Sequence, residues 1–148
     1  MGISSSRALP LRPPVASGKT RICVSGFTLS HHTGRARKIA DAIVTARPDL
    51  YESWFYFDSK GFRDFINSTI KPMLPQEQQE KFASHKSSPF CWLELDDGSL
   101  DAKGGRDRFC EWAASEFPSD AAILQLATTE PSLSEVWVDE SAGTAPQN

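Results

Sequence analysis

The segment Ser84–Leu95, SHKSSPFCWLEL, decides the fold. Its second half begins at Pro89 and is a short apolar run, which is typical of a buried strand. The residues Asp96–Gly98, DDG, then predict a tight hairpin turn, and the residues Ser99–Lys103, SLDAK, predict a short edge strand. This stretch therefore predicts an antiparallel pair of strands late in the chain.

Upstream of this pair, strand and helix patterns alternate. Thr20–Phe27, TRICVSGF, predicts a first strand, and the aromatic run Tyr51–Phe57, YESWFYF, predicts a second. A helix between them ends before Pro48, and another follows the second strand and ends near Pro72 and Pro75. The apolar positions with helical spacing are Ala36, Ile39, Ala40 and Ile43 in the first helix and Phe62, Phe65, Ile66, Ile70 and Met73 in the second.

Downstream, Gly104 and Gly105 precede a last helix that Pro118 ends. The predicted order is β-α-β-α-β-β-α, an α/β arrangement that gives a mixed four-stranded sheet with helices on both faces. This order resembles the thioredoxin fold. The predicted domain covers residues 20–128, between a Ser/Pro-rich basic tail at 1–19 and a C-terminal tail at 129–148.

Composition limits the possible functions. The 148 residues suit one domain with tails, and no apolar run approaches membrane-spanning length. The three cysteines, Cys23, Cys91 and Cys110, lie in apolar patterns and are expected to be buried, reduced thiols of a cytoplasmic protein. Their odd number gives no disulfide framework.

The net charge of −3 hides a strong asymmetry. Residues 1–40 contain seven basic residues and no acidic one, so the remainder carries −10. We expect this basic segment to bind an acidic partner, with a solvated basic tail as the alternative. Nucleic acid is not expected, because aromatic residues do not alternate with the basic ones. The predicted contacts are Arg7, Arg12, Lys19, Arg21, Arg35, Arg37 and Lys38.

The start of the first helix is the expected site. In thioredoxin-like enzymes this position carries Cys-x-x-Cys, where the helix dipole lowers the thiol pKa. Here it carries Ser30, His31, His32 and Thr33, which excludes dithiol chemistry. Ser30 is predicted to cap the helix. The two histidines are interpreted as solvated or partner-contacting residues, since no third ligand nearby would complete a metal shell.

Two further features of the sequence belong to the same site, which lacks the cysteines of a thioredoxin-like enzyme. Pro89 matches the proline that thioredoxin-like proteins keep in the cis form before their third strand. Gly104-Gly105 resembles the glutaredoxin Gly-Gly segment, whose N–H groups receive a carboxylate of glutathione.

The pattern His-Lys-x-Ser-Pro-x-x-Trp-x-Glu-Leu, at 85–95, followed by Gly-Gly-x-x-x-Phe, at 104–109, resembles the glutaredoxin-like N-terminal domain of animal malate-dehydrogenase-like proteins. The likeness covers roughly residues 20–117, but those relatives carry Cys-Pro-Tyr-Tyr where this chain has Ser-His-His-Thr. No Gly-x-Gly-x-x-Gly is present, so dehydrogenase activity is not implied. The chain also resembles, in architecture and in its missing cysteines, the thioredoxin-like proteins of apicomplexan cortical microtubules.

These resemblances imply a non-catalytic, cofactor-free structural or adaptor protein of a cytoskeletal assembly. Tubulin or microtubule-associated proteins are the expected partners. A glutathione-binding or monothiol glutaredoxin-like protein is the alternative. A third interpretation is a myristoylated peripheral membrane adaptor. Residues 1–6, MGISSS, match an N-myristoylation signal with Gly2 as acceptor, and this lipid would give weak membrane contact. An unmodified start and an organellar transit peptide remain open for this segment.

Overall fold

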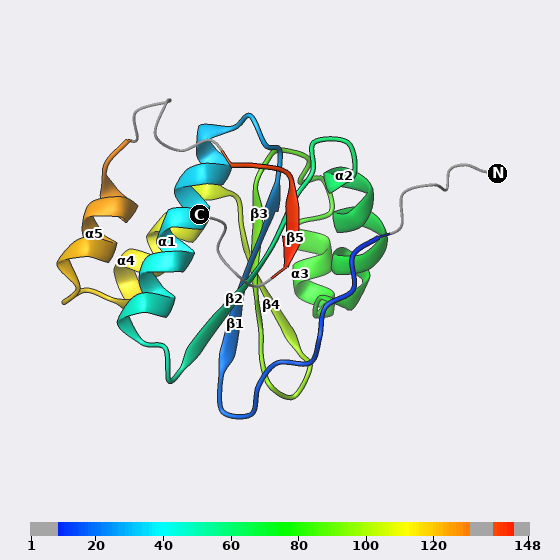
Figure 1. Cartoon of the computed structure of the whole chain (residues 1–148). Coiled ribbons are helices and arrows are strands. Elements are labelled where there is room, and N and C mark those ends of the chain that lie inside the picture. The colour runs from blue at the N-terminus through cyan, green and yellow to red at the C-terminus, as the bar shows by residue number, and fades with distance from the viewer. Residues whose placement is uncertain (1–8, 131–137, 144–148) are drawn as a thin grey trace.

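A computed structural model describes residues 9–130 and 138–143 of the chain. Figure 1 shows a twisted sheet with helices on either side. In chain order the elements are β1 (Thr20–Gly26), α1 (His31–Ala46), β2 (Tyr51–Phe57), α2 (Phe62–Phe65), the π-helical turn η1 (Ile66–Ile70), the 3₁₀ turn η2 (Lys71–Met73), α3 (Gln76–Lys81), β3 (Phe90–Glu94), β4 (Leu100–Gly104), α4 (Arg106–Glu116), α5 (Ala121–Thr128) and β5 (Ser141–Gly143).

The sheet is mixed and has five strands in the order β4-β3-β1-β2-β5. β1 and β2 are parallel, as a helical crossover requires, and the other neighbouring pairs are antiparallel. The α/β class is therefore confirmed, but the prediction of four strands is wrong. The additional strand, β5, lies inside the segment predicted as a C-terminal tail and pairs with Phe55–Phe57 of β2.

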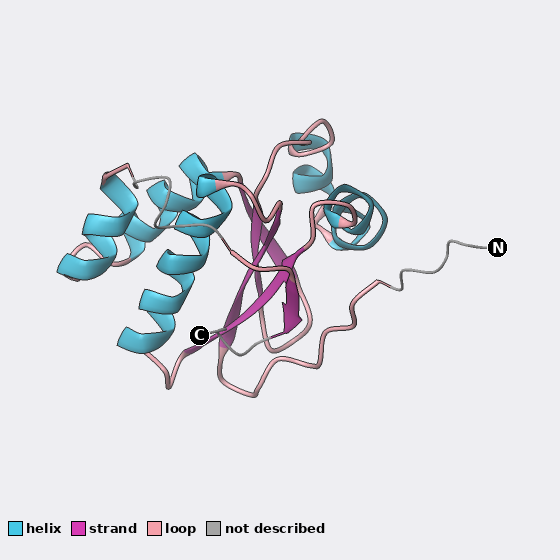
Figure 2. Ribbon diagram, turned by 45° about the horizontal axis from the view of Figure 1, so that its top comes forward, coloured by secondary structure: helices cyan, strands magenta, loops and turns pink. Residues whose placement is uncertain are grey.

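Each face of the sheet has its own core. α1, α4 and α5 pack on one face, and α2, η1, η2 and α3 lie on the other, as the turned view in Figure 2 shows. Alternate residues of β1 face opposite layers: Ile22 and Val24 join the first core, whereas Cys23 joins the second. The predicted placement of helices on both faces is confirmed.

The N-cap and the buried face of the helix α1 are those that the sequence predicts. The hydroxyl of Ser30 accepts a hydrogen bond from the backbone N–H of Thr33, so Ser30 caps the helix as predicted. The predicted apolar face is confirmed, because its four residues, Ala36, Ile39, Ala40 and Ile43, are completely buried.

Some elements differ from the prediction. The second helix is a run of α, π and 3₁₀ turns, and Met73 at its end is 49% exposed rather than buried. The hairpin between β3 and β4 has five connecting residues, and the Leu95–Ser99 backbone hydrogen bond closes it around the predicted turn at Asp96–Gly98. The helix α5 was not predicted; Asp120 caps it by accepting from the N–H of Ile123.

Residues 9–19 are an extended strap that lies against the domain rather than a separate tail. Arg12 forms an ion pair with Glu94 and lies over the ring of Trp54. The backbone N–H of Gly18 donates to Asp96 at 2.8 Å. These contacts fix the path of the strap into β1 (Figure 1).

Among the described residues, no helix combines the length and apolar character needed to cross a bilayer.

Candidate functional site

Thr33, at the second of the two positions where a thioredoxin-like enzyme carries cysteine, forms a hydroxyl pair with Ser88. The Thr33 hydroxyl, on the first turn of α1, is 2.7 Å from the Ser88 hydroxyl, which precedes β3. Ser88 also accepts from the backbone N–H of Phe27 at 2.8 Å. A Cβ at Gly26 would lie 2.6 Å from the Thr33 hydroxyl, so only glycine leaves room for this arrangement. The pair joins the end of β1, the start of α1 and the segment before β3.

The peptide bond between Ser88 and Pro89 is cis, as predicted. It borders a cavity of about 490 Å³ that lies between the start of α1, the segment after α3 and the start of α4. The residues that line the cavity are His32, Lys81, Phe82, Ser84, His85, Ser87, Ser88, Gly105, Arg106, Asp107 and Arg108. The structure thus brings together three parts of the predicted site that are far apart in sequence.

The Gly-Gly segment leads from β4 into α4 beside this cavity. Gly104 has φ +84°, and a Cβ there would lie 2.9 Å from the Phe82 ring and 3.0 Å from the Arg108 side chain. Gly105 is the N-cap of α4 and has no side chain to bond the first N–H groups of the helix. The two glycines therefore let the Phe82 ring and the start of α4 approach closely at the cavity.

Histidine side chains stand on two sides of the cavity. The rings of His31 and His32 are 4.1 Å apart, and Nδ1 of His32 is buried without a hydrogen-bond partner. Burial lowers the pKa of His32, and the positive charges of His31 and Arg106 lower it further. Burial likewise lowers the pKa of His85, although its bonds to the carbonyls of Ser87 and Pro89 oppose that shift. His32 and His85 are therefore mainly neutral at pH 7.

No cysteine belongs to this site. Cys23, Cys91 and Cys110 are buried and unpaired, as predicted. Burial raises the pKa of each thiol, so all three are poor nucleophiles at neutral pH. Among the described residues, no group of three or more His, Cys, Asp or Glu side chains is placed to hold a metal ion.

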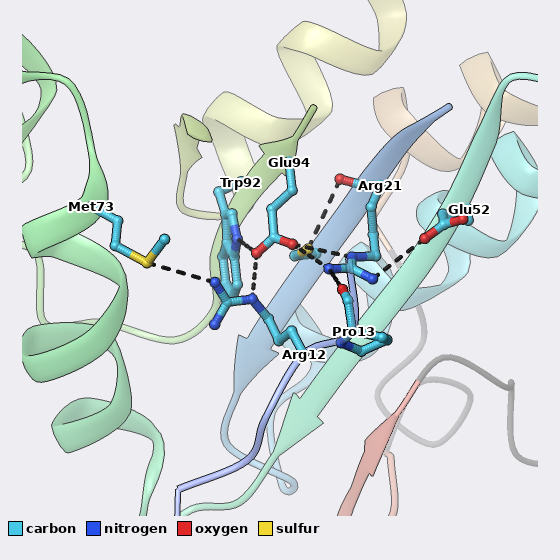
Figure 3. Close-up of polar contacts among 8 residues, drawn as sticks. Arg12, Pro13, Arg21, Glu52, Met73, Trp92 and Glu94 are labelled. Carbon is cyan, nitrogen blue, oxygen red and sulfur yellow. Dashed lines mark hydrogen bonds and ion pairs between the residues drawn. The ribbon is translucent and has the colours of Figure 1, made fainter. Parts of the chain in front are cut away.

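Two basic residues predicted to contact a partner form an internal ion cluster instead (Figure 3). Arg21 is only 2% exposed, and its guanidinium donates to Glu94 at 2.6 Å and 3.1 Å and to the Pro13 carbonyl. Arg12 bonds the second oxygen of Glu94, which also accepts from the indole of Trp92 at 2.9 Å. Arg12 and Arg21 therefore neutralise a buried carboxylate, which corrects the expectation that they bind a partner.

Arg35 is also internal. It is 5% exposed, and its guanidinium donates to the carbonyl of Leu126 near the C-terminus of α5, where helix carbonyls favour a cation. A partner contact at Arg35, which the sequence predicts, would need an exposed side chain, and this side chain is buried. Its neighbour Arg37 pairs with Asp41 and lies over the ring of Phe55.

Few of the predicted basic contacts remain accessible. Lys38 is exposed and Lys19 is half-buried. Arg7 and the proposed lipidation residue Gly2 lie outside the described residues.

Sequence reasoning missed several residues of the cavity. Lys81, His85 and Arg108 line it, but they lie on different elements, and nothing in the local pattern connects them. Ser88 could have been found from the sequence, because it directly precedes the predicted cis-proline. In the structure its hydroxyl bonds to that of Thr33. In comparisons of its sequence, no family model and no curated protein matches this chain.

Proposed function

We propose that this protein is a redox-inactive member of the thioredoxin-fold class that acts as a structural or adaptor component. The hydrogen bond between Thr33 and Ser88 carries this proposal. It joins the hydroxyl of Ser88 to that of Thr33, which stands at the position where a thioredoxin-like enzyme has its resolving thiol. Ser30 caps the helix at the position where such an enzyme has its attacking cysteine. Hydroxyls are not ionised by a helix dipole near neutral pH, so they give no thiolate for disulfide exchange.

The fold assignment in this proposal rests on topology. A parallel β1-α1-β2 unit is followed by an antiparallel β3-β4 hairpin and the helix α4, with helices on both faces of the sheet. A cis Ser88–Pro89 bond precedes β3 beside the start of α1. The strand β5 and the helix α5 are additions to the thioredoxin arrangement.

A reductase assay tests the redox part of the proposal. We expect turnover of hydroxyethyl disulfide with glutathione, and of insulin with dithiothreitol, to equal that of a variant in which the three cysteines are serine or alanine. Turnover of the parent protein clearly above that variant would overturn the proposal.

As the partner we propose the acidic surface of microtubules. The excess of basic residues in the first forty positions supports it, with Lys19 and Lys38 as the contacts that remain accessible. The test is co-sedimentation with polymerised tubulin between about 0.05 and 0.3 M salt, because screening weakens such binding over this range. We expect Lys19→Glu with Lys38→Glu to reduce binding, and Lys60→Glu with Lys86→Glu to serve as the charge-matched control. Equal binding of all three proteins, or preference for anionic vesicles, would contradict the tubulin assignment.

A second candidate function, glutathione binding, is favoured by the cavity itself. Its lining includes Gly105, from the Gly-Gly segment that resembles the glutathione-binding segment of glutaredoxins, and Ser88, which precedes the cis-proline. Calorimetric titration with reduced glutathione tests it, and an S-methyl analogue separates binding from thiol chemistry. Absence of heat at millimolar concentration would remove this candidate.

A further inference from the structure

The cavity beside α4 contains two cationic side chains that no acidic residue neutralises. Lys81, at the end of α3, and Arg108, on the first turn of α4, both line it. Each lies against the same aromatic ring: the Lys81 ammonium is 5.5 Å and the Arg108 guanidinium 5.9 Å from the centre of Phe82. Among the described residues neither has an ion-pair partner. Both side chains are exposed at the opening of the cavity.

The other charged side chains around the cavity are paired with one another. Arg106 pairs with Asp107 at 2.8 Å and with Glu130 at 3.0 Å, so its charge is already balanced. His32 and His85 are mainly neutral at pH 7 because burial lowers the pKa of each. The charged residues that line the cavity therefore sum to about +2, and Glu130, which pairs with Arg106 from outside the lining, lowers this sum to about +1.

Polar groups suited to an anion line the same cavity. The hydroxyls of Ser84 and Ser87 line the cavity, and neither is used in another hydrogen bond of the described structure. Gly105 and Arg106 begin α4 on the same cavity, and no side chain caps the free N–H groups of that helix. The exposed hydroxyls and N–H groups can donate to oxygen atoms placed between Lys81 and Arg108.

We propose that this cavity binds a phosphomonoester. Such a group carries about −1.5 to −2 charge at pH 7 and three acceptor oxygens, which matches two unpaired cations and several free donors. The cavity of about 490 Å³ is larger than a phosphate group requires. The ligand therefore has an organic part that packs beside Phe82, as small-molecule sites commonly combine a few polar groups with an aromatic wall.

The source of the phosphomonoester is a phosphorylated residue of a protein or a small phosphorylated metabolite. The experiment titrates the ¹⁵N-labelled full chain at constant ionic strength, and backbone amide shifts report binding. The probes are O-phospho-L-serine, a phosphoserine pentapeptide, glycerol 3-phosphate, and unphosphorylated serine and pentapeptide as controls. We expect saturable shifts at Ser87, Gly105 and Arg106 with the phosphorylated probes alone. Tighter binding of the pentapeptide assigns a protein source, and tighter binding of glycerol 3-phosphate assigns a metabolite.

Substitutions that remove a positive charge test which residues bind the phosphate group. Lys81→Gln with Arg108→Gln is expected to raise the Kd for O-phospho-L-serine about tenfold, because both charge-assisted contacts are lost. Arg47→Gln with Lys60→Gln changes the net charge equally, at exposed positions that do not line the cavity, and is expected to leave the Kd unchanged. Since Lys81 and Arg108 are exposed, the melting temperature of the double variant should stay near that of the parent.

Three results would overturn the proposal. The first is no saturable shift with any phosphorylated probe. The second is an equal loss of affinity in the two double variants, which would indicate binding by net charge alone. The third is an identical response to serine and to phosphoserine. The adaptor role would survive any of these results, because it rests on Thr33 and Ser88 rather than on the cations.

Discussion

The hydroxyl of Thr33 and the hydroxyl of Ser88 lie 2.7 Å apart, and this hydrogen bond joins α1 to the segment before β3 across 55 residues of sequence. Thr33 is completely buried, so its hydroxyl has no water to replace a lost partner. The bond therefore holds together the two segments that border the candidate site.

Thr33→Val should destabilise the protein, because it removes the hydrogen bond between the completely buried Thr33 and the half-buried hydroxyl of Ser88. We expect the free energy of unfolding to fall by about 1–2 kcal/mol in urea denaturation. Thr28→Val removes a comparable but exposed hydroxyl contact, to Ser59, and should cost less than about 0.5 kcal/mol. Equal losses for the two variants would show that the Thr33–Ser88 bond has no special role.

Ser30→Cys should create a reactive thiol. Ser30 occupies the N-cap of α1, where free N–H groups and the helix dipole stabilise a thiolate. We expect the new thiol to have a pKa below the ordinary value of about 8.5, measured by the pH dependence of thiolate absorbance. Ser119→Cys, on an exposed loop, is the control and should titrate near the ordinary value. The native thiols contribute little background, since burial raises the pKa of each.

Glu94→Gln should be strongly destabilising at pH 7. The carboxylate is 4% exposed and is the charge partner of Arg21, which is 2% exposed. Removing one charge of a buried pair leaves the other uncompensated, at a cost of about 3 kcal/mol. Thermal or urea unfolding measures the loss. A change of less than about 0.5 kcal/mol would show that the cluster in Figure 3 contributes nothing to stability.

The same carboxylate should make stability depend on acid pH. Burial alone would raise the pKa of Glu94, but hydrogen bonds from Trp92 and Arg21 and the charges of Arg12 and Arg21 outweigh it, and the pKa lies below its ordinary value of 4.5. A lowered folded pKa means that the contribution is fully present above pH 4.5 and is lost as pH falls through the folded value. The stability difference between the parent and Glu94→Gln should therefore shrink below about pH 4.5. A constant difference between pH 7 and pH 3 would contradict this.

Arg12→Ala should lower stability by about 1–2 kcal/mol, because it removes one guanidinium from Glu94 and releases the strap. Lys60→Ala, at an exposed position, is the control. The sequence alone places residues 1–19 in a tail outside the domain, and loss of such a tail would leave the melting temperature nearly unchanged. The contacts of Arg12 and Gly18 now predict a lower melting temperature for that truncation. An unchanged value would mean that the strap does not stabilise the domain.

Local patterns in the sequence were sufficient for most of the framework. The apolar spacing of α1, the aromatic run of β2 and the composition of β3 each describe a single element, and each element forms where it was predicted. Ser30 was recognisable as a cap, and the Ser88–Pro89 bond is cis as expected. These features are encoded within a few residues, since hydrophobic periodicity and capping depend on near neighbours.

Contacts between distant segments decided the rest. β5 has only three residues and no strand pattern, so its pairing with β2 depends on the sheet edge that β2 offers. The basic residues look alike in sequence, yet Arg12 and Arg21 converge on Glu94, whereas Lys38 remains exposed. The cavity combines α1, the segment after α3 and the start of α4. The sequence by itself therefore determined which elements form, while only the tertiary structure decided which charges are buried and which stay free to bind, because burial and ion pairing depend on residues that the chain brings together from far apart.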